Sequence, residues 1–100
     1  MQMMVIIYHK LLEEIVQRVL EEHGVTSYTE DPKVLGAGEA GKVDDTRHHP
    51  GYNGCIFAAM SEDRVQPVSR ALQDLAEKYK HEFGRPAGLR AFTLACEQTV

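Results

Sequence analysis

The sequence predicts an α+β fold in which two amphipathic helices cover one face of a four-stranded antiparallel sheet. Apolar residues recur with the period of a helix in two segments, and apolar runs rich in β-branched residues flank each segment. The resulting order is strand, helix, strand, strand, helix, strand, which right-handed crossovers close into a two-layer sandwich. The 100 residues support one hydrophobic core, so we expect a single domain over residues 1–100.

The first half of the chain supplies a strand, a helix and a second strand. Met3–Tyr8 is a continuous apolar run, which is typical of a strand buried on both faces. Val25–Val34 is extended but contains Pro32, which favours an edge position because proline has no N–H. Between them lies a helical segment that ends at Gly24. Its apolar stripe consists of Leu11, Leu12, Ile15, Val16, Val19 and Leu20.

The second half begins with a third strand, Asn53–Met60, which a second helix follows. Ser61 or Asp63 can cap this helix. Pro67 is expected in its first turn, where the missing N–H costs no hydrogen bond. The stripe that we expect to face the core consists of Val68, Leu72, Leu75, Tyr79 and Phe83.

A fourth strand completes the fold and brings apolar residues to both sheet faces. Gly84–Gly88 ends the helix, and Leu89–Glu97 alternates as a strand with Phe92 and Leu94 on one of its faces. The order of elements is that of the ferredoxin-like βαββαβ sandwich. Because two helices cover only one face of such a sheet, we expect a homo-oligomer that packs the other faces together.

Composition excludes several classes of function. The formal charge of −4 argues against a general nucleic-acid binder, which usually has a basic face. We expect no membrane span, because no apolar run approaches roughly 18 residues, and the opening residues lack the features of a signal peptide. We therefore expect a cytoplasmic protein whose partner is a small molecule or a protein. No nucleophile falls beside a base in this topology, so we expect no enzyme activity.

A glycine-rich segment follows the second strand. Gly36, Gly38 and Gly41 have the spacing of a dinucleotide-binding turn, but no helical period follows them, so the Rossmann interpretation fails. We interpret residues 35–53 as a flexible loop. The glycines either keep a surface loop flexible or form the base of a ligand-binding loop, and the sequence leaves both interpretations open.

Four stretches of the chain are informative when taken together: "VIIYHKLLEEIVQRVLEEHGVTSYT", the glycine-bearing loop, "NGCIFAAMSED" and "GLRAF". They resemble the PII signal-transduction superfamily, in particular its compact PII-like branch, and the resemblance covers about residues 3–97. It implies a homotrimer with clefts between subunits that bind an adenine nucleotide. It also implies that residues 35–53 are a T-loop that engages a protein target such as a transporter or an enzyme. PII-like relatives that respond to bicarbonate make this anion a second expected ligand.

The same resemblance implies the positions of the site residues. Thr29 corresponds to a residue near the adenine ring, and Gly36 and Gly38 correspond to the base of the T-loop. Gly88 corresponds to the glycine of the short turn before the last strand. In the family, backbone N–H groups at the base of the T-loop can face phosphates, and a lysine in the turn before the last strand contacts phosphate.

This chain departs from the family where a lysine contacts phosphate, because Leu89 stands at that position. Arg47, Arg85 and Arg90 are the nearby cations that we expect to replace it. The alternative interpretation is that these arginines are solvated surface charges. No covalent-modification tyrosine of the PII type is present in the loop, so nitrogen sensing is not carried over.

The loop also offers a competing chemistry. His48 and His49 follow Asp44 and Asp45, and imidazole and carboxylate groups are ligands of transition metals. Adjacent histidines rarely bind one metal ion together without loop strain, so a solvated loop surface is the other interpretation. A transition-metal-binding trimer that uses these histidines, or a structural module without a ligand, is therefore the alternative to a nucleotide-binding regulator.

Overall fold

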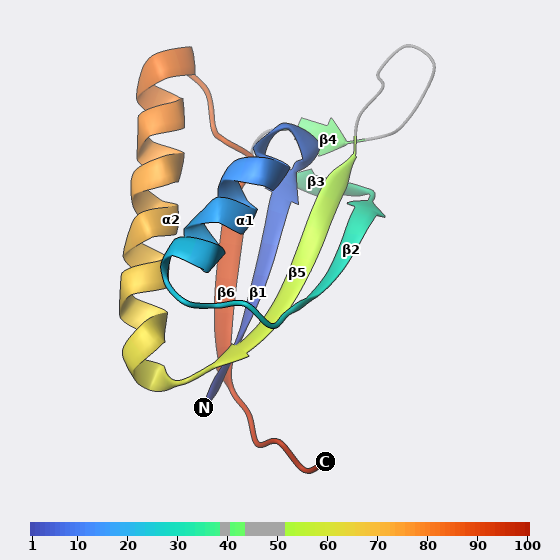
Figure 1. The fold of residues 1–100 in the computed structure, drawn as a ribbon. Helices are drawn as coiled ribbons and strands as arrows, with labels where there is room; N and C mark the ends of the chain where they lie inside the picture. The colour runs from blue at the N-terminus through green and yellow to red at the C-terminus, as the bar shows by residue number, and fades with distance from the viewer. Residues whose placement is uncertain (39–40, 44–51) are drawn as a thin grey trace.

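The computed structural model of the chain describes residues 1–38, 41–43 and 52–100 and has the predicted α+β architecture. One antiparallel sheet has the strand order β2-β5-β1-β6, and two helices cover one of its faces (Figure 1). Its elements are β1 (Gln2–His9), α1 (Glu13–Glu22), β2 (Thr29–Val34), β5 (Asn53–Met60), α2 (Glu62–Phe83) and β6 (Arg90–Ala95). The order of the main elements is the one that the sequence predicts.

The core lies between the sheet and the two helices. Strands β1 and β5 turn alternate residues toward the helices, as their period of two requires. Each helix packs one apolar stripe against these strand residues. The largest fully buried side chains are Met4, Ile6, Tyr8, Val16, Leu20, Ile56 and Val68. These contacts explain why the helical face of the two central strands, β1 and β5, is closed within a single chain.

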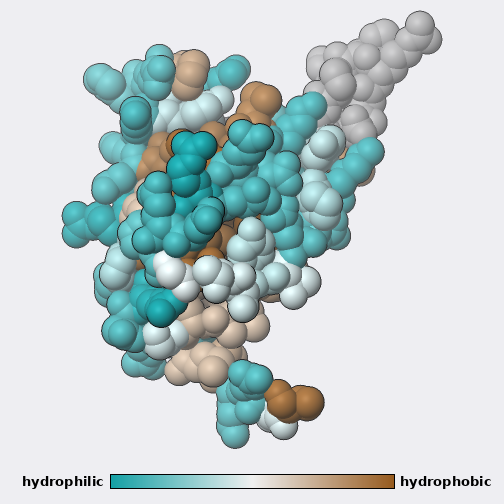
Figure 2. Space-filling view, viewed as in Figure 1, coloured by the Kyte–Doolittle hydropathy of each residue, from teal (hydrophilic) through white to brown (hydrophobic). Residues whose placement is uncertain are grey.

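The opposite face of the sheet has no covering element among the described residues. Val5 on β1 pairs with Phe57 on β5 and with Phe92 on β6, so that the three side chains form one row across this face. Phe57 is 44% exposed and Phe92 is 50% exposed. By contrast, the helical side of the molecule is mostly hydrophilic (Figure 2). The predicted uncovered apolar face is therefore present.

Several boundaries differ from the sequence prediction. Gly36–Gly38 (β3) and Gly41–Val43 (β4) pair as two short antiparallel strands, although the whole of residues 35–53 was expected to be a loop. The extended segment expected from Val25 becomes a strand only at Thr29, because residues 25–28 form the connection from α1. Backbone pairing between separate segments determines both the β3–β4 pair and the start of β2. The residue types at these positions do not indicate that pairing.

Helix α2 begins one turn earlier relative to its proline than predicted. Ser61 is the N-cap residue, as one of the two proposed candidates. Pro67 therefore lies in the second turn and not in the first. A proline there removes one hydrogen bond of the helix interior. None of the helices in the described part of the chain is both long and apolar enough to cross a membrane.

Candidate functional site

Three segments meet at His9, at the end of the sheet where β1 ends and β5 begins. The His9 N–H donates to the Gly88 carbonyl at 3.1 Å, and the next residue, Lys10, donates its N–H to the Tyr52 carbonyl at 3.0 Å. His9 also pairs with Asn53 across β1 and β5. The end of β1 thus joins the exit of the loop to the turn before β6.

Gly88 has the backbone conformation that this turn requires. Its φ of +69° lies in the left-handed region, which side chains with a Cβ rarely adopt. The resemblance implied that Gly88 lies at a ligand, and the structure places it at the loop-bearing end of the sheet beside His9. Gly36 lies at the same end, because a Cβ on Gly36 would lie 3.2 Å from Nδ2 of Asn53.

Positive charge gathers at this end although the whole chain is acidic. The Lys10 ammonium lies 5.2 Å from the centroid of the Tyr52 ring, and the Lys33 ammonium lies 5.5 Å from the same centroid. Partial burial, followed by the charges of Lys10 and Arg85, holds the pKa of His9 below its usual value. Lys10, Lys33 and Arg85 are thus the described cationic side chains near this end of the sheet.

His9 also fixes the start of the helical segment. Its Nδ1 accepts a hydrogen bond from the Leu11 N–H at 3.3 Å and caps the short 3₁₀ helix η1 (Lys10–Leu12), which precedes α1. In the neutral ring the proton is then on Nε2. The lowered pKa favours this neutral form, so His9 offers a hydrogen-bond donor and not a cation at neutral pH.

The other predicted site residues are spread along the sheet. Arg85 is exposed in the turn after α2, and Arg90 is exposed as the first residue of β6, opposite Ile7. Thr29 opens β2 opposite Phe57, four positions along β5 from Asn53 and therefore away from Gly36. The structure thus brings Gly36, Gly88 and Arg85 to one end and places Thr29 nearer the other.

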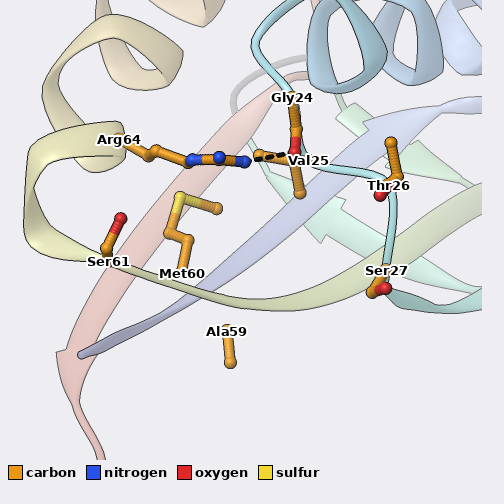
Figure 3. A pocket seen from close by; sticks show the side chains of 8 residues that line it. All are labelled: Gly24, Val25, Thr26, Ser27, Ala59, Met60, Ser61 and Arg64. Carbon is orange, nitrogen blue, oxygen red and sulfur yellow. Dashed lines mark hydrogen bonds between the residues drawn. The ribbon is translucent and has the colours of Figure 1, made fainter.

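A polar hollow lies at that other end, between the α1–β2 connection and the start of α2. Its volume is about 440 Å³, within the usual range for small-molecule sites. It is lined by Gly24, Val25, Thr26, Ser27, Ala59, Met60, Ser61 and Arg64. Arg64 reaches across it and donates a hydrogen bond to the Gly24 carbonyl (Figure 3). The hollow therefore presents hydroxyl groups and one guanidinium, two residues before Thr29.

A partly buried polar network ties α1 to β2 on the helical face. The Tyr8 hydroxyl, on a side chain that is 0% exposed, donates to Glu30 Oε1 at 2.8 Å, and Gln17 donates to Glu30 Oε2 at 2.9 Å. Burial raises the pKa of Glu30, but the hydrogen bonds from Gln17, Tyr8 and Glu13 outweigh it and leave the pKa lowered. Glu30 thus remains a carboxylate that fixes the strand leading into the loop.

The pKa of Glu13 is shifted in the direction opposite to that of Glu30. The hydrogen bond with Glu30 and then partial burial raise the pKa of Glu13. The two carboxyl groups therefore share their protons unequally, with Glu13 as the group that holds a proton more readily. Burial also raises the pKa of the Tyr8 hydroxyl, and the hydrogen bond to Glu30 adds to this effect. Each of these groups has a structural partner, and none is poised as a nucleophile.

The described residues offer little to metal binding or covalent chemistry. Arg47, His48 and His49, together with the acids before them, lie outside the described residues. Among the residues that are described, no group of three or more histidine, cysteine or acidic side chains is arranged to hold a metal ion. Burial and, after it, the charge of Asp31 raise the pKa of the Cys55 thiol, so it is protonated at neutral pH.

Sequence reasoning did not identify Lys33, Tyr52 or Arg64. Lys33 and Tyr52 are 19 positions apart and meet at the ring only after the sheet has formed. In the sequence, Arg64 is an ordinary charged residue in the first turn of a helix. Its hydrogen-bond partner, the Gly24 carbonyl, lies in a distant part of the chain. No periodicity signals contacts of this kind.

Comparison with known proteins gives matches at the level of three-dimensional structure alone. No protein-family model matches the sequence, and no curated protein matches it. The chain is similar to CPII, a nitrogen regulatory PII-like protein from Thiomonas intermedia K12, in its structure bound to ADP, AMP and bicarbonate. The TM-score is 0.70 and the identity is 20%, over 93% of this chain and 84% of that one.

Two further CPII structures from the same organism agree. The apo form gives a TM-score of 0.68 with 19% identity, over 93% of this chain and 85% of that chain. The form bound to ADP, AMP and acetate gives 0.61 with 18% identity, over 97% and 88%. The predicted resemblance is thus confirmed for the fold: the chain has the α+β fold of these PII-like proteins.

Proposed function

We propose that the chain is a PII-like regulatory protein that binds an adenine nucleotide, or a small anion such as bicarbonate, at clefts between the subunits of a homotrimer. Residues 35–53 would transmit the bound state to a protein target such as a transporter or an enzyme. The observation that carries the proposal is the shared fold. It extends over 93% of the chain and matches a protein whose structures contain ADP, AMP and bicarbonate.

The uncovered sheet face supports the trimer. Phe57, Phe92 and Leu94 are 44%, 50% and 53% exposed. Burial of such side chains is favourable by about 25 cal/mol per Å² of apolar surface. A second and third copy that present the same face would bury it, as closed symmetric assemblies of one chain do. The clefts would then lie where the edges of neighbouring sheets meet.

The arrangement of polar groups supports an orientation for the nucleotide. The base would lie toward Thr29 and the polar hollow, where hydroxyl groups and backbone groups are available. The phosphates would lie toward Gly36, Gly88 and Arg85, at the positive end of the sheet. Guanidinium groups bind phosphate with charge-assisted hydrogen bonds. A regulatory role without catalysis fits this arrangement, because these groups bind anions and supply no activated nucleophile.

Isothermal titration with ATP, ADP, AMP and bicarbonate tests the proposal. Arg47, Arg85 and Arg90 are replaced by alanine one at a time and then together, and Arg70→Ala on the exposed side of α2 is the matched control. We expect at least one single variant to bind nucleotide about tenfold more weakly, and the triple variant to lose binding, because each charge-assisted bond contributes about 1.5–3 kcal/mol.

Two results would contradict the proposal. If the triple variant binds nucleotide as tightly as the parent, the phosphates lie elsewhere. If the parent binds no nucleotide and no bicarbonate but binds zinc or copper, and loses the metal in a His48→Ala, His49→Ala variant, the metal-binding alternative replaces it. No observation among the described residues favours that alternative at present.

A further inference from the structure

Of the described residues that line the polar hollow, Arg64 alone carries a positive charge. It extends from the first turn of α2 to the α1–β2 connection, where its guanidinium donates a hydrogen bond to the Gly24 carbonyl (Figure 3). Val25 and Met60 are each 5% exposed and give the lining an apolar part, and hydroxyl groups complete it. The hollow thus combines an apolar wall, a planar cation and groups that can donate or accept hydrogen bonds.

Gly24 makes room for the guanidinium. A Cβ added to Gly24 would lie 2.9 Å from Nη1, 3.3 Å from Cζ and 3.6 Å from Nη2 of Arg64, so it would press against the whole group. The φ of Gly24 is +75°, in the left-handed region that residues with a Cβ rarely adopt. The position of the guanidinium therefore depends on a residue without a side chain directly after α1.

The charges beside the hollow favour an uncharged ligand group over an anion. Glu62 and Asp63 precede Arg64 in the first turn of α2. A hydrogen bond with Ser61 is the main cause of the lowered pKa of Asp63, so its carboxylate is charged at neutral pH. An anion would be attracted by one guanidinium and repelled by two carboxylates, whereas a neutral ring avoids this repulsion. The hollow is therefore better suited to a base than to a phosphate.

We propose that Arg64 determines the base specificity of the hollow by stacking its planar guanidinium on a purine ring. Guanidinium groups stack on aromatic faces, and the two fused rings of a purine offer a larger face than the single ring of a pyrimidine. The hydrogen bond to Gly24 already holds Arg64 across the hollow, so little side-chain freedom is lost when the ring binds. The inference rests on the proposed function for one point, namely that the ring belongs to a nucleotide.

Isothermal titration with ADP, UDP and sodium pyrophosphate tests the inference. The variants are Arg64→Ala and Arg64→Lys, of which the second keeps the charge but loses the planar group. Arg70→Ala removes a charge from the exposed side of α2 and is the control. We expect the parent and the control to prefer ADP over UDP. Both Arg64 variants should bind ADP about tenfold more weakly, with a smaller change for UDP and none for pyrophosphate.

A pair of glycine substitutions tests the position of the guanidinium without removing it. Gly24→Ala should displace the Arg64 side chain. Gly84→Ala is the matched control, because Gly84 follows α2 with a φ of +68° and no described atom lies within 4 Å of its added Cβ. Both substitutions carry a similar backbone cost, which urea denaturation measures. Only Gly24→Ala should reduce the preference for ADP over UDP.

Several results would overturn the inference. One is a ratio of ADP to UDP affinity that is the same in Arg64→Ala as in the parent. Another is an equal loss of binding for ADP, UDP and pyrophosphate in that variant, because Arg64 would then act through the fold. An equal loss of preference in Gly24→Ala and Gly84→Ala would have the same consequence, as would a parent without any preference for ADP.

Titration with adenosine and uridine separates this inference from the proposed function. If the parent prefers adenosine, loses that preference in Arg64→Ala and binds ADP no more tightly than adenosine, the base site stands and the nucleotide function fails. If ADP binds tightly and Arg64→Ala leaves its advantage over UDP unchanged, the nucleotide function stands and the role of Arg64 fails.

Discussion

The two faces of the sheet have similar apolar patterns but differ in the exposure of their side chains. On the helical face Met4 and Ile6 are 0% exposed, whereas on the other face Phe92 and Leu94 are 50% and 53% exposed. The alternation of β1 supplies apolar residues to both faces, but the helices of the described residues cover only one. The comparison teaches that the helical face stabilises the subunit, and that the uncovered face remains available for association.

The largest effect is expected on the helical face, at Gly54. It lies opposite Tyr8 across β1 and β5, and a Cβ added to it would lie 2.1 Å from Cζ and from the hydroxyl of Tyr8. The Tyr8 ring is fully buried and cannot move aside without breaking its bond to Glu30. We expect Gly54→Ala to lower the free energy of unfolding by about 3 kcal/mol, at the upper end for overpacked cores, as measured by urea denaturation.

Gly36→Ala is the control for this substitution. Among the described residues, its added Cβ would meet only the side-chain amide of Asn53, at 3.2 Å, which can turn away. We expect a change below about 1 kcal/mol for this variant. Equal losses for the two variants would show that the Tyr8 ring does not restrict position 54.

The next effect concerns the uncovered face. Phe92→Asp places a charge at the β6 end of the row formed with Val5 and Phe57. If this face is buried between copies, an unpaired charge there is too costly to keep, and the assembly dissociates while the helical face keeps each subunit folded. We expect light scattering to give the mass of a trimer for the parent and a mass near 11.2 kDa for the variant.

Thr93→Asp is the control that shows whether the effect of a new charge depends on the face of the sheet or only on its being in β6. Thr93 is exposed, pairs with Met4 and therefore lies on the helical side of β6. The Thr93→Asp variant introduces the same charge one residue away from Phe92, and we expect it to leave the trimer intact. A parent mass near 11.2 kDa at micromolar concentration would refute the trimer and, with it, the clefts between subunits.

The same comparison explains what sequence could predict. Strand alternation and helical stripes depend on residues close in the chain, so the sheet, both helices and the uncovered face followed from periodicity. The fit of Gly54 to Tyr8 and the approach of Lys10 and Lys33 to Tyr52 depend on the register of β1, β2 and β5. Many registers are compatible with one pattern, so no local signal identified these contacts. The register of the strands also determines the separation of Thr29 from Gly36.

The smallest effect is expected from the hydroxyl of Tyr8, which anchors Glu30 beneath α1. Tyr8→Phe keeps the ring against Gly54 and removes one donor to a carboxylate. We expect a loss of about 1–2 kcal/mol near neutral pH, because hydrogen bonds to charged groups contribute more than neutral ones. Tyr28→Phe, on a side chain that is 38% exposed, is the control and should change stability little.

The dependence of this loss on pH identifies Glu30 as the partner. The pKa of Glu30 is lowered in the folded state, so its contribution is present above its unfolded pKa and is lost as pH falls through the folded pKa. The raised pKa of Glu13 has the opposite sign: its contribution is present at low pH and is lost as pH rises. Glu13→Gln keeps a donor and removes that titration. In this background the cost of Tyr8→Phe, measured by urea denaturation, should be largest near neutral pH and should shrink in acid. A cost that is independent of pH would mean that the Tyr8 hydroxyl contributes to packing and not to the charge on Glu30.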